Sequence, residues 1–342
     1  MSIGLRILID ARFLGRNPYS GVEEYGQQLI ARLRRLAPEN EYRTITNRFF
    51  GIPNKIFRLN PIPVDRLMPA DLIYSPHLNF LRHSPRTPRI MTIHDLSFIH
   101  HPHFFSFRDR FWHWQQRVKK QAERAALIIT DSRFSKNDIS ETLKIPEEKI
   151  KVIYPGIGPE FRKIKSPNPH PLVLNPYILY LGRLEPRKNI EALIRAFRLL
   201  KSKFHNLKLA LTGSGGITVA DPDIIFTGPV SPEERLMLYN QAEVFVYPSF
   251  FEGFGFPPLE AQACGCPVIV SSRASLPEIV GRSGLQIDPW RIEELAGAIG
   301  AVLTNQTLRQ RLIALGLKNV QRFNWLNAAQ ELLKYFSSVS VS

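Results

Sequence analysis

The sequence predicts an α/β protein of two domains, each a doubly wound parallel sheet with helices on both faces. Near-continuous apolar strands alternate with helical patterns along the whole chain, which is typical of parallel sheets covered on both sides. The length of 342 residues, 44% of them apolar, favours two domains over one. A proline-rich stretch separates the two series of strands and marks the expected boundary.

The first half of the chain opens with an apolar strand at 5–10 and an amphipathic helix over 22–36. Further strands are expected at 71–75, 89–95, 126–131 and 151–155, and helices over 107–125 and 135–144. Six prolines then lie between Tyr154 and Tyr177, where neither a long helix nor a central strand can run. The first domain is therefore expected to span residues 1–165.

The same alternation restarts after the prolines. Strands are expected at 177–182, 207–213, 223–228, 244–249 and 267–271, with helices over 189–204, after Ser231-Pro232, from Pro257 or Pro258, and over 292–303, 308–316 and 326–336. We expect a second domain over 166–322 and, in 323–342, a C-terminal helix that packs back on the first domain. Two such domains would form a cleft lined by the carboxyl ends of both sheets, where open α/β sheets bind ligands.

Charge is distributed unevenly along the chain, whose net charge is +15. Residues 1–165 carry 28 Lys and Arg against 16 Asp and Glu, whereas residues 166–342 carry 17 against 14, so the first domain is expected to face any anionic partner. Nucleic acid is not an expected partner, because no binding module accompanies the charge. Cys264 and Cys266 indicate a reducing compartment, and with neither a signal peptide nor a run of bilayer length the cytoplasm is expected.

Two residues of the first half are candidates for ligand contact. Gly21 opens a helix in SGVEEY, where free N–H groups suit phosphate or sugar oxygens, although a glycine that only turns the chain fits equally well. No G-x-G-x-x-G follows the strand that ends at Asp10, which weighs against a dinucleotide cofactor. His94 ends the strand RIMTIHD and would lie at its carboxyl end. The nearby histidines 100, 101 and 103 lack metal-ligand spacing.

The segment 104–124 combines aromatic and basic side chains. With Ser106 as N-cap, one helix over 107–125 would align a stripe of Phe107, Phe111, Trp114 and Val118 beside Arg110, Arg117 and Arg124. We interpret it first as a core stripe beneath a solvated basic face. The alternative is a contact with an anionic membrane or a lipid-linked acceptor.

Two loops of the second half carry the strongest signals. LGRLEPRKN (181–189) places three cations between a strand and a helix, and Arg183 and Lys188 would neutralise a diphosphate there. PSFFEGFGFPPLEA (248–261) follows another strand, exposes backbone N–H groups and carries Glu252 and Glu260. Such carboxylates accept pairs of hydroxyl hydrogen bonds, so together they can hold a hexose and a ribose.

On these residues the sequence resembles the family 4 glycosyltransferases, retaining enzymes with the GT-B fold of two Rossmann-like domains. The resemblance rests on Glu252–Glu260 with the following EAQACGCPVIVSSRASLPEIVG, and on LGRLEPRKN, SGVEEY, TIHDLS, TDSRFSKNDI and VIYPGI. TIHDLS and EGFGFPPLEAQACGCPVI are most similar to bacterial mannosyltransferases.

The resemblance implies a role for each matching residue. Glu260 would hold the ribose hydroxyls and Glu252 the hexose hydroxyls, while Phe254, Gly255 and Phe256 would offer backbone N–H groups. Arg183 and Lys188 would bind the diphosphate and stabilise its charge in place of a metal ion. His94 would contact the hexose face, and Gly21 would lie near phosphate and acceptor. Ser20 stands where the family often has a second glycine.

The implied reaction moves a hexose, expected to be mannose from GDP-mannose, to a hydroxyl of a glycan or lipid-linked acceptor, with retention of anomeric configuration. No cofactor and no metal ion are expected. A UDP-hexose donor is one alternative. A UDP-sugar epimerase of the same fold is another, but it needs an acid and a base flanking the sugar, which 252–260 does not offer. The expected site of action is the inner face of an anionic membrane, contacted through the basic helix.

Overall fold

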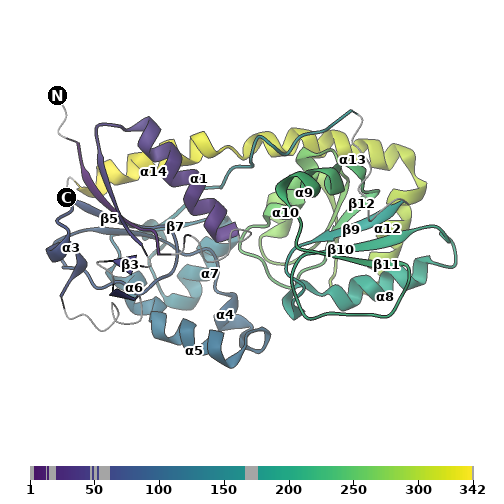
Figure 1. Ribbon diagram of the computed structural model, residues 1–342, viewed down its shortest axis with the longest axis horizontal. Coiled ribbons are helices and arrows are strands. Elements are labelled where there is room, and N and C mark those ends of the chain that lie inside the picture. The colour runs from purple at the N-terminus through teal and green to yellow at the C-terminus, as the bar shows by residue number, and fades with distance from the viewer. Residues whose placement is uncertain are drawn as a thin grey trace. The chain divides into compact units, whose positions relative to one another are not determined.

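The computed structural model describes residues 4–12, 14, 21–46, 48–49, 52–53, 62–165 and 176–340. The chain forms two compact units, one of Met1–Gly156 with Asn324–Ser342 and the other of Ile157–Phe323 (Figure 1). The first division falls at Gly156, upstream of the residue 165 expected from the prolines. The C-terminal helix belongs to the first unit.

The first unit is built on a sheet of parallel strands. Its strands are β1 (Arg6–Asp10), β2 (Glu41–Ile45), β5 (Leu72–Ser75), β6 (Arg89–Thr92), β7 (Leu127–Thr130) and β8 (Ile150–Val152). Their order in the sheet is β2-β1-β5-β6-β7-β8, so the order reverses between β1 and β5. A short antiparallel pair, β3 (Arg48–Phe49) with β4 (Ile52–Pro53), stands apart from it. Every residue of β5, β6 and β7 is buried, as their apolar sequences predict.

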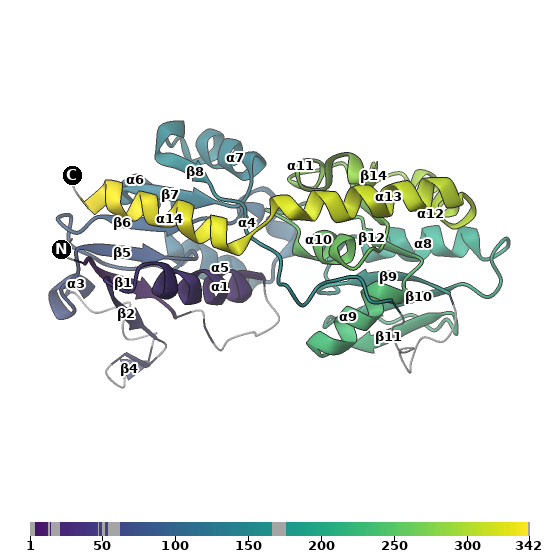
Figure 2. The same ribbon diagram turned by 90° about the horizontal axis from the view of Figure 1, so that it is seen from above.

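Helices cover this sheet, and the last of them comes from the far end of the chain. They are α1 (Gly21–Leu36), α3 (Val64–Leu67), α4 (Ser97–His100), α5 (Phe107–Gln116), α6 (Val118–Arg124), α7 (Arg133–Leu143) and α14 (Trp325–Ser340), with 3-10 turns η1 (Pro102–Phe104) and η2 (Glu147–Lys149). Helix α14 packs beside α1, where the rings of Trp325 and Tyr25 lie 6.0 Å apart (Figure 2). None of the described helices is both long enough and apolar enough to cross a bilayer.

The prediction of one helix over 107–125 is wrong, because the chain breaks it at Arg117. Ser106 caps α5 as expected, accepting the Asp109 N–H, but Arg117 takes the left-handed conformation (φ 49°) before α6 begins. Two buried glutamines flank the break: Gln116 Oε1 accepts the Phe80 N–H at 2.8 Å, and Gln121 Nε2 donates to the Gln116 carbonyl at 2.6 Å. The tertiary hydrogen bond from Phe80 and the local one across the break outweigh the helical periodicity of the segment.

The interpretation of the aromatic stripe as core is also wrong. Phe107, Phe111 and Trp114 are 83%, 50% and 72% exposed, and of the stripe only Val118 is buried. Helix α5 itself buries only Gln116. Large apolar side chains therefore project from the first unit into solvent.

The second unit repeats the architecture of the first. Its strands are β9 (Tyr177–Leu181), β10 (Lys208–Thr212), β11 (Ile224–Gly228), β12 (Val244–Tyr247), β13 (Val268–Ser271) and β14 (Gly284–Ile287), in the sheet order β11-β10-β9-β12-β13-β14. Its helices are α8 (Ile190–Leu200), α9 (Pro232–Gln241), α10 (Phe256–Ala263), α11 (Leu276–Val280), α12 (Ile292–Thr304) and α13 (Gln306–Asn319), with 3-10 turns η3 (Pro186–Lys188), η4 (Gly281–Ser283) and η5 (Val320–Arg322). The predicted fold class, with its two parallel sheets, is confirmed.

A close backbone contact joins the loops that follow β9 and β10. The Leu184 N–H donates to the Ser214 carbonyl at 2.8 Å, and the Gly182 N–H donates to the Thr212 carbonyl at 3.0 Å. Gly213 has a φ of +134°, and a Cβ there would lie 2.0 Å from the Gly182 carbonyl oxygen. Only glycine fits this contact, which fixes the loop after β9.

Gly213→Ala is therefore expected to destabilise the protein by about 1–3 kcal/mol, since it adds both strain and a clash. Gly216→Ala in the same loop is the matched control, because nothing lies within 4 Å of a Cβ there. Chemical unfolding of both variants measures the difference. Equal stability of the two would show that the contact between the loops is not needed.

Candidate functional site

The second unit carries two loops at the place where its strand order reverses. The chain runs from β9 outward through β10 to β11 and then returns to place β12 on the other side of β9. The carboxyl ends of two such strands form a crevice that α/β proteins use for ligands. The loop 182–189 follows β9, and the loop 248–255 follows β12.

An ion pair between Lys188 and Glu252 joins these two loops. Lys188 Nζ lies 2.6 Å from Glu252 Oε1 and donates to the Tyr247 hydroxyl at 2.7 Å. Both charged side chains are buried. Two of the sequence-predicted site residues are thus in direct contact, and Tyr247 holds the ammonium from the end of β12.

Arg187 forms the second half of the same cluster. Its Nη1 donates to Glu252 Oε2 at 3.1 Å and to the Phe251 carbonyl at 2.6 Å, while its Nη2 donates to Glu185 Oε1 at 2.8 Å. The sequence shows Arg187 as one of the three loop cations but predicts no role for it. The sequence signal that could have predicted this contact is the pair of adjacent cations, Arg187 and Lys188, in one loop and the glutamate Glu252 in the other.

The charges of this cluster fix its protonation. Burial raises the pKa of Glu252, but Arg187 and Lys188 lower it by more, to about 2. Burial and the repulsion from Arg187 lower the pKa of Lys188, while Glu252 raises it. Glu252 is therefore a carboxylate throughout the neutral range, and the cations beside it are held by charge-assisted hydrogen bonds.

Arg183 lies in the same loop but differs from the buried pair. Its side chain is 71% exposed, with Nε 3.6 Å from Glu185 Oε2. The Tyr180 hydroxyl donates to its carbonyl at 2.9 Å and so fixes its backbone. The guanidinium projects outward from a fixed backbone, an arrangement suited to reaching an anionic ligand.

Ser275 and Leu276 hold the loop from Glu252 to Phe256 in place. Ser275 Oγ lies 2.9 Å from the carbonyl oxygens of both Glu252 and Phe254. Gly255 turns the chain with φ +110°, and a Cβ there would come within 2.8 Å of Leu276. Helix α10 then begins at Phe256, whose ring lies 5.0 Å from that of Phe254.

Glu260 on α10 has partners of its own. Tyr239 donates its hydroxyl to Glu260 Oε2 at 2.8 Å, and Arg235 Nη1 lies 3.6 Å from Oε1. Burial raises the pKa of this carboxyl although Arg235 opposes the shift. Glu252 and Glu260 thus have separate sets of partners. Tyr239 and Arg235 come from α9, where the sequence gave no signal for a site.

The first unit places His94 in a polar setting after β6. Its Nδ1 lies 2.5 Å from Asp131 Oδ2, and its Nε2 lies 3.1 Å from the Pro76 carbonyl oxygen. Burial lowers the pKa of His94, but Asp131, Asp95 and the Pro76 carbonyl together raise it above its usual value. Since both ring nitrogens face acceptors, we assign the imidazolium form. The ring of Tyr25 meets its edge at 4.8 Å.

A second polar group lies where the strand order of the first unit reverses. Asp10 ends β1, and its carboxylate lies 2.6 Å from Arg12 Nη2, both side chains being buried. Burial raises the pKa of Asp10, but Arg12 lowers it to about 2. The predicted Gly21 is the first residue of α1. Ser20 lies outside the described residues.

Comparison with known proteins places the chain in a family. The model for Glycosyltransferase Family 4 matches residues 24–161, and that for Glycosyl transferases group 1 matches 163–318. O-antigen chain mannosyltransferase B of Escherichia coli is 31% identical over 269 residues, which are 72% of this chain and 69% of that protein. The serotype-specific mannosyltransferase WbdA of Escherichia coli is 30% identical over 236 residues, 63% of this chain but 29% of WbdA.

The crystal structure of Anabaena HepE in complex with UDP and glucose matches with a TM-score of 0.72 at 19% identity, covering 98% of this chain and 100% of that chain. This likeness and the two parallel sheets define a GT-B protein. The chain belongs to the group 1 glycosyltransferases, as the sequence predicts.

Proposed function

We propose that this protein transfers mannose from GDP-mannose to a hydroxyl of a glycan or lipid-linked acceptor, with retention of the anomeric configuration. The observation that carries the proposal is the buried Lys188–Glu252 pair at the reversal of strand order in the second unit. Two mannosyltransferases among the relatives support the choice of hexose. A UDP-hexose is the alternative donor, because HepE was crystallised with UDP and glucose.

Lys188 and Arg183 would supply the positive charge that the reaction needs. As the bond from the hexose anomeric carbon to the diphosphate breaks, negative charge grows on the leaving phosphate. Lys188 uses two of its three N–H donors on Tyr247 and Glu252, which leaves one for a phosphate oxygen. Such a preorganised cation stabilises the leaving group without a metal ion. The acceptor oxygen bonds to the anomeric carbon, and its proton passes to a phosphate oxygen.

Glu252 and His94 would position the hexose. In this proposal Glu252 accepts hydrogen bonds from hexose hydroxyls while Arg187 and Lys188 hold its carboxylate in place. The His94 imidazolium, which Asp131 fixes, is proposed to contact the sugar ring. The N–H groups of Phe254, Gly255 and Phe256 line the turn before α10. The epimerase alternative is not favoured, because the family of the chain is a glycosyltransferase family.

Glu260 is proposed to bind the ribose of the nucleotide. Glu260→Gln keeps an oxygen for the Tyr239 hydroxyl but loses the charge, so each ribose hydrogen bond weakens, and we expect nucleotide affinity to fall about ten-fold. Glu243→Gln, which loses a surface carboxylate near Arg309, is the control. Calorimetric titration measures both. Unchanged affinity in Glu260→Gln would remove the ribose role.

The function is tested with a panel of nucleotide sugars in buffer containing EDTA. GDP-mannose should raise the melting temperature most, since only the true donor satisfies both the hexose and the nucleotide contacts. Transfer should persist in EDTA. Stronger stabilisation by a UDP-sugar would replace the donor, and complete loss of activity in EDTA, restored by a divalent ion, would overturn the metal-free reaction.

We also propose that the protein works at the cytoplasmic face of a membrane, bound peripherally. The first unit, which includes the basic segment 104–124, would face the lipid. An acceptor held in that membrane would then meet the donor without leaving the surface.

A further inference from the structure

Helix α5 presents an unpartnered aromatic face on the first unit. Phe107, Phe111 and Trp114 are mostly or half exposed, and the rings of Phe111 and Trp114 stack at 5.7 Å. Ile99 on α4 is also exposed. Large apolar groups gathered on one surface mark a contact with another molecule or with a membrane.

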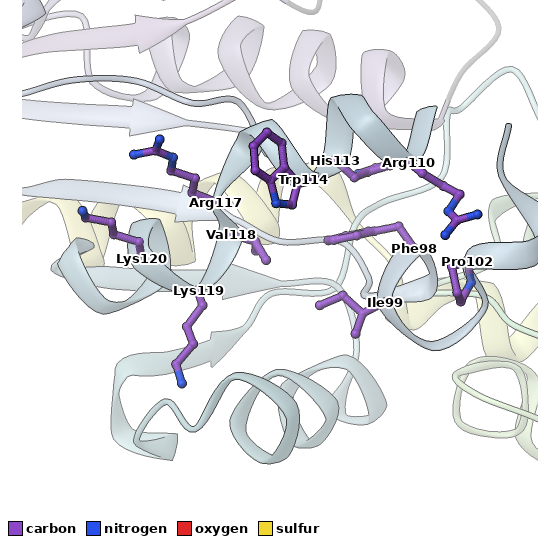
Figure 3. Close-up of a pocket in the computed structure, with 10 residues that line it drawn as sticks. All are labelled: Phe98, Ile99, Pro102, Arg110, His113, Trp114, Arg117, Val118, Lys119 and Lys120. Atoms are coloured by element: carbon purple, nitrogen blue, oxygen red, sulfur yellow. The ribbon is translucent and has the colours of Figure 1, made fainter. Parts of the chain in front are cut away.

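Beside this face lies a cavity of about 540 Å³ between α4, α5 and α6. Its apolar lining comes from Phe98, Ile99, Pro102, Trp114 and Val118. Figure 3 shows Arg117, Lys119 and Lys120 on one side of these side chains and Arg110 on the other. Among the described residues that line it, none is acidic. An apolar floor between cations fits an anionic amphiphile.

A buried polar atom lies in the wall of the cavity. His113 stacks on Phe98 with ring centroids 4.2 Å apart, and among the described residues its Nδ1 is buried with no hydrogen-bond partner. A buried nitrogen of this kind costs free energy unless a ligand or water satisfies it. The wall therefore carries both apolar area and an unsatisfied polar group.

We propose that this cavity binds one anionic phospholipid of the bilayer, and that α5 inserts its aromatic face beside it. The phosphate would lie among Arg110, Arg117, Lys119 and Lys120, and the acyl chain against Phe98, Ile99 and Val118. Cations near an anionic surface and aromatic side chains at the headgroup level are the features of interfacial helices. The inference rests on the proposed peripheral location and names its lipid and its binding site.

The cavity lies close in the sequence to one residue of the proposed reaction. Phe98 and Ile99 belong to α4, which begins three residues after His94 in the connection from β6. The cavity and His94 therefore share one connection that follows β6.

The left-handed residues of the first unit offer a matched pair of variants. Arg117 and Lys144 both end a helix with positive φ, 49° and 59°, and glycine adopts that conformation freely. Arg117→Gly and Lys144→Gly each remove one cation without straining the backbone, but only Arg117 lines the cavity. Trp114→Ala is paired with Trp290→Ala, which removes another exposed tryptophan from the second unit.

Binding is measured first by sedimentation with vesicles of phosphatidylglycerol and phosphatidylcholine or of phosphatidylcholine alone. Wild-type protein should bind only the anionic vesicles. Arg117→Gly should weaken binding about five-fold, and Trp114→Ala by at least as much, with both controls unchanged. Equal binding to neutral vesicles, or wild-type binding by both cavity variants, would overturn the docking surface.

The cavity itself is tested with a lipid monomer. Short-chain phosphatidylglycerol below its micellar concentration should bind saturably to wild type and about five-fold more weakly to Arg117→Gly, whereas inorganic phosphate should not displace it. Vesicle binding without monomer binding would overturn the lipid site alone. Stabilisation by GDP-mannose should be the same in Arg117→Gly, Lys144→Gly and Trp114→Ala as in wild type, so a failure here is distinct from a failure of the proposed transferase function.

Discussion

Lys188→Ala is expected to lower kcat by about 10²–10³, the loss typical when one preorganised donor to a developing charge is removed. The buried ammonium of Lys188, fixed by Glu252 and Tyr247, would contribute most when negative charge accumulates on the leaving diphosphate. KM for the donor should therefore change less than kcat. Initial rates over a range of donor concentrations measure the split.

Lys201→Ala is the matched control for this variant. Lys201 also forms an ion pair in the second unit, with Nζ 2.8 Å from Asp223 Oδ2. Its ammonium also donates to the carbonyls of His205 and Leu207, and none of these three partners belongs to the loop 182–189 or the loop 248–255. It should retain wild-type kcat and KM. A change in KM alone in Lys188→Ala would mean that Lys188 binds donor and transition state equally and does not act on the leaving group.

Glu252→Gln is expected to cost both stability and activity. The carboxylate neutralises two buried or half-buried cations. Its loss leaves Lys188 without this counter-charge and Arg187 with Glu185 in place of two carboxylates, so unfolding free energy should fall by about 3–5 kcal/mol. Turnover should also fall, because the hexose loses its acceptor and Lys188 loses its anchor. Urea unfolding and initial rates measure the two effects. A stable and fully active Glu252→Gln would remove Glu252 from the site.

The pH dependence of stability provides a second readout on Glu252. Its pKa lies at about 2 in the folded protein, below the usual 4.5, so its contribution is present above pH 4.5 and is lost as the pH falls toward 2. A shift of this size corresponds to about 3 kcal/mol at neutral pH. The stability difference between wild type and Glu252→Gln should therefore shrink between pH 5 and pH 2. A constant difference would show that the charge of Glu252 is not what stabilises the fold.

The sequence predicted the central strands because their apolar runs leave few alternatives. It missed β2 and β14, which are edge strands of their sheets and bury only their last residue. It also missed the break at Arg117, because that break depends on hydrogen bonds that Gln116 and Gln121 accept from the distant residues Phe80 and Arg89. Periodicity reports which faces are apolar, but it does not report such long-range bonds.

For the candidate site, the sequence predicted the charged residues but not the side chains that hold them in place. Lys188 and Glu252 each belong to a recognisable sequence motif, and in the structure the two side chains form an ion pair. In the sequence Tyr247 and Tyr239 are ordinary strand and helix residues. In the fold the Tyr247 hydroxyl accepts from Lys188, and the Tyr239 hydroxyl donates to Glu260. Sheet order decides which loops meet, and the sequence alone does not give the order β9-β12.

The central claim is that Lys188 acts on the charge of the leaving diphosphate. It is tested most directly by calorimetric titration of wild type and Lys188→Ala with the donor that the panel selects and with its free nucleoside diphosphate. The free diphosphate carries the full charge that develops in the reaction, so Lys188→Ala should weaken its binding by at least ten-fold more than that of the nucleotide sugar. Equal losses for the two ligands, or no loss for either, would contradict the role assigned to Lys188.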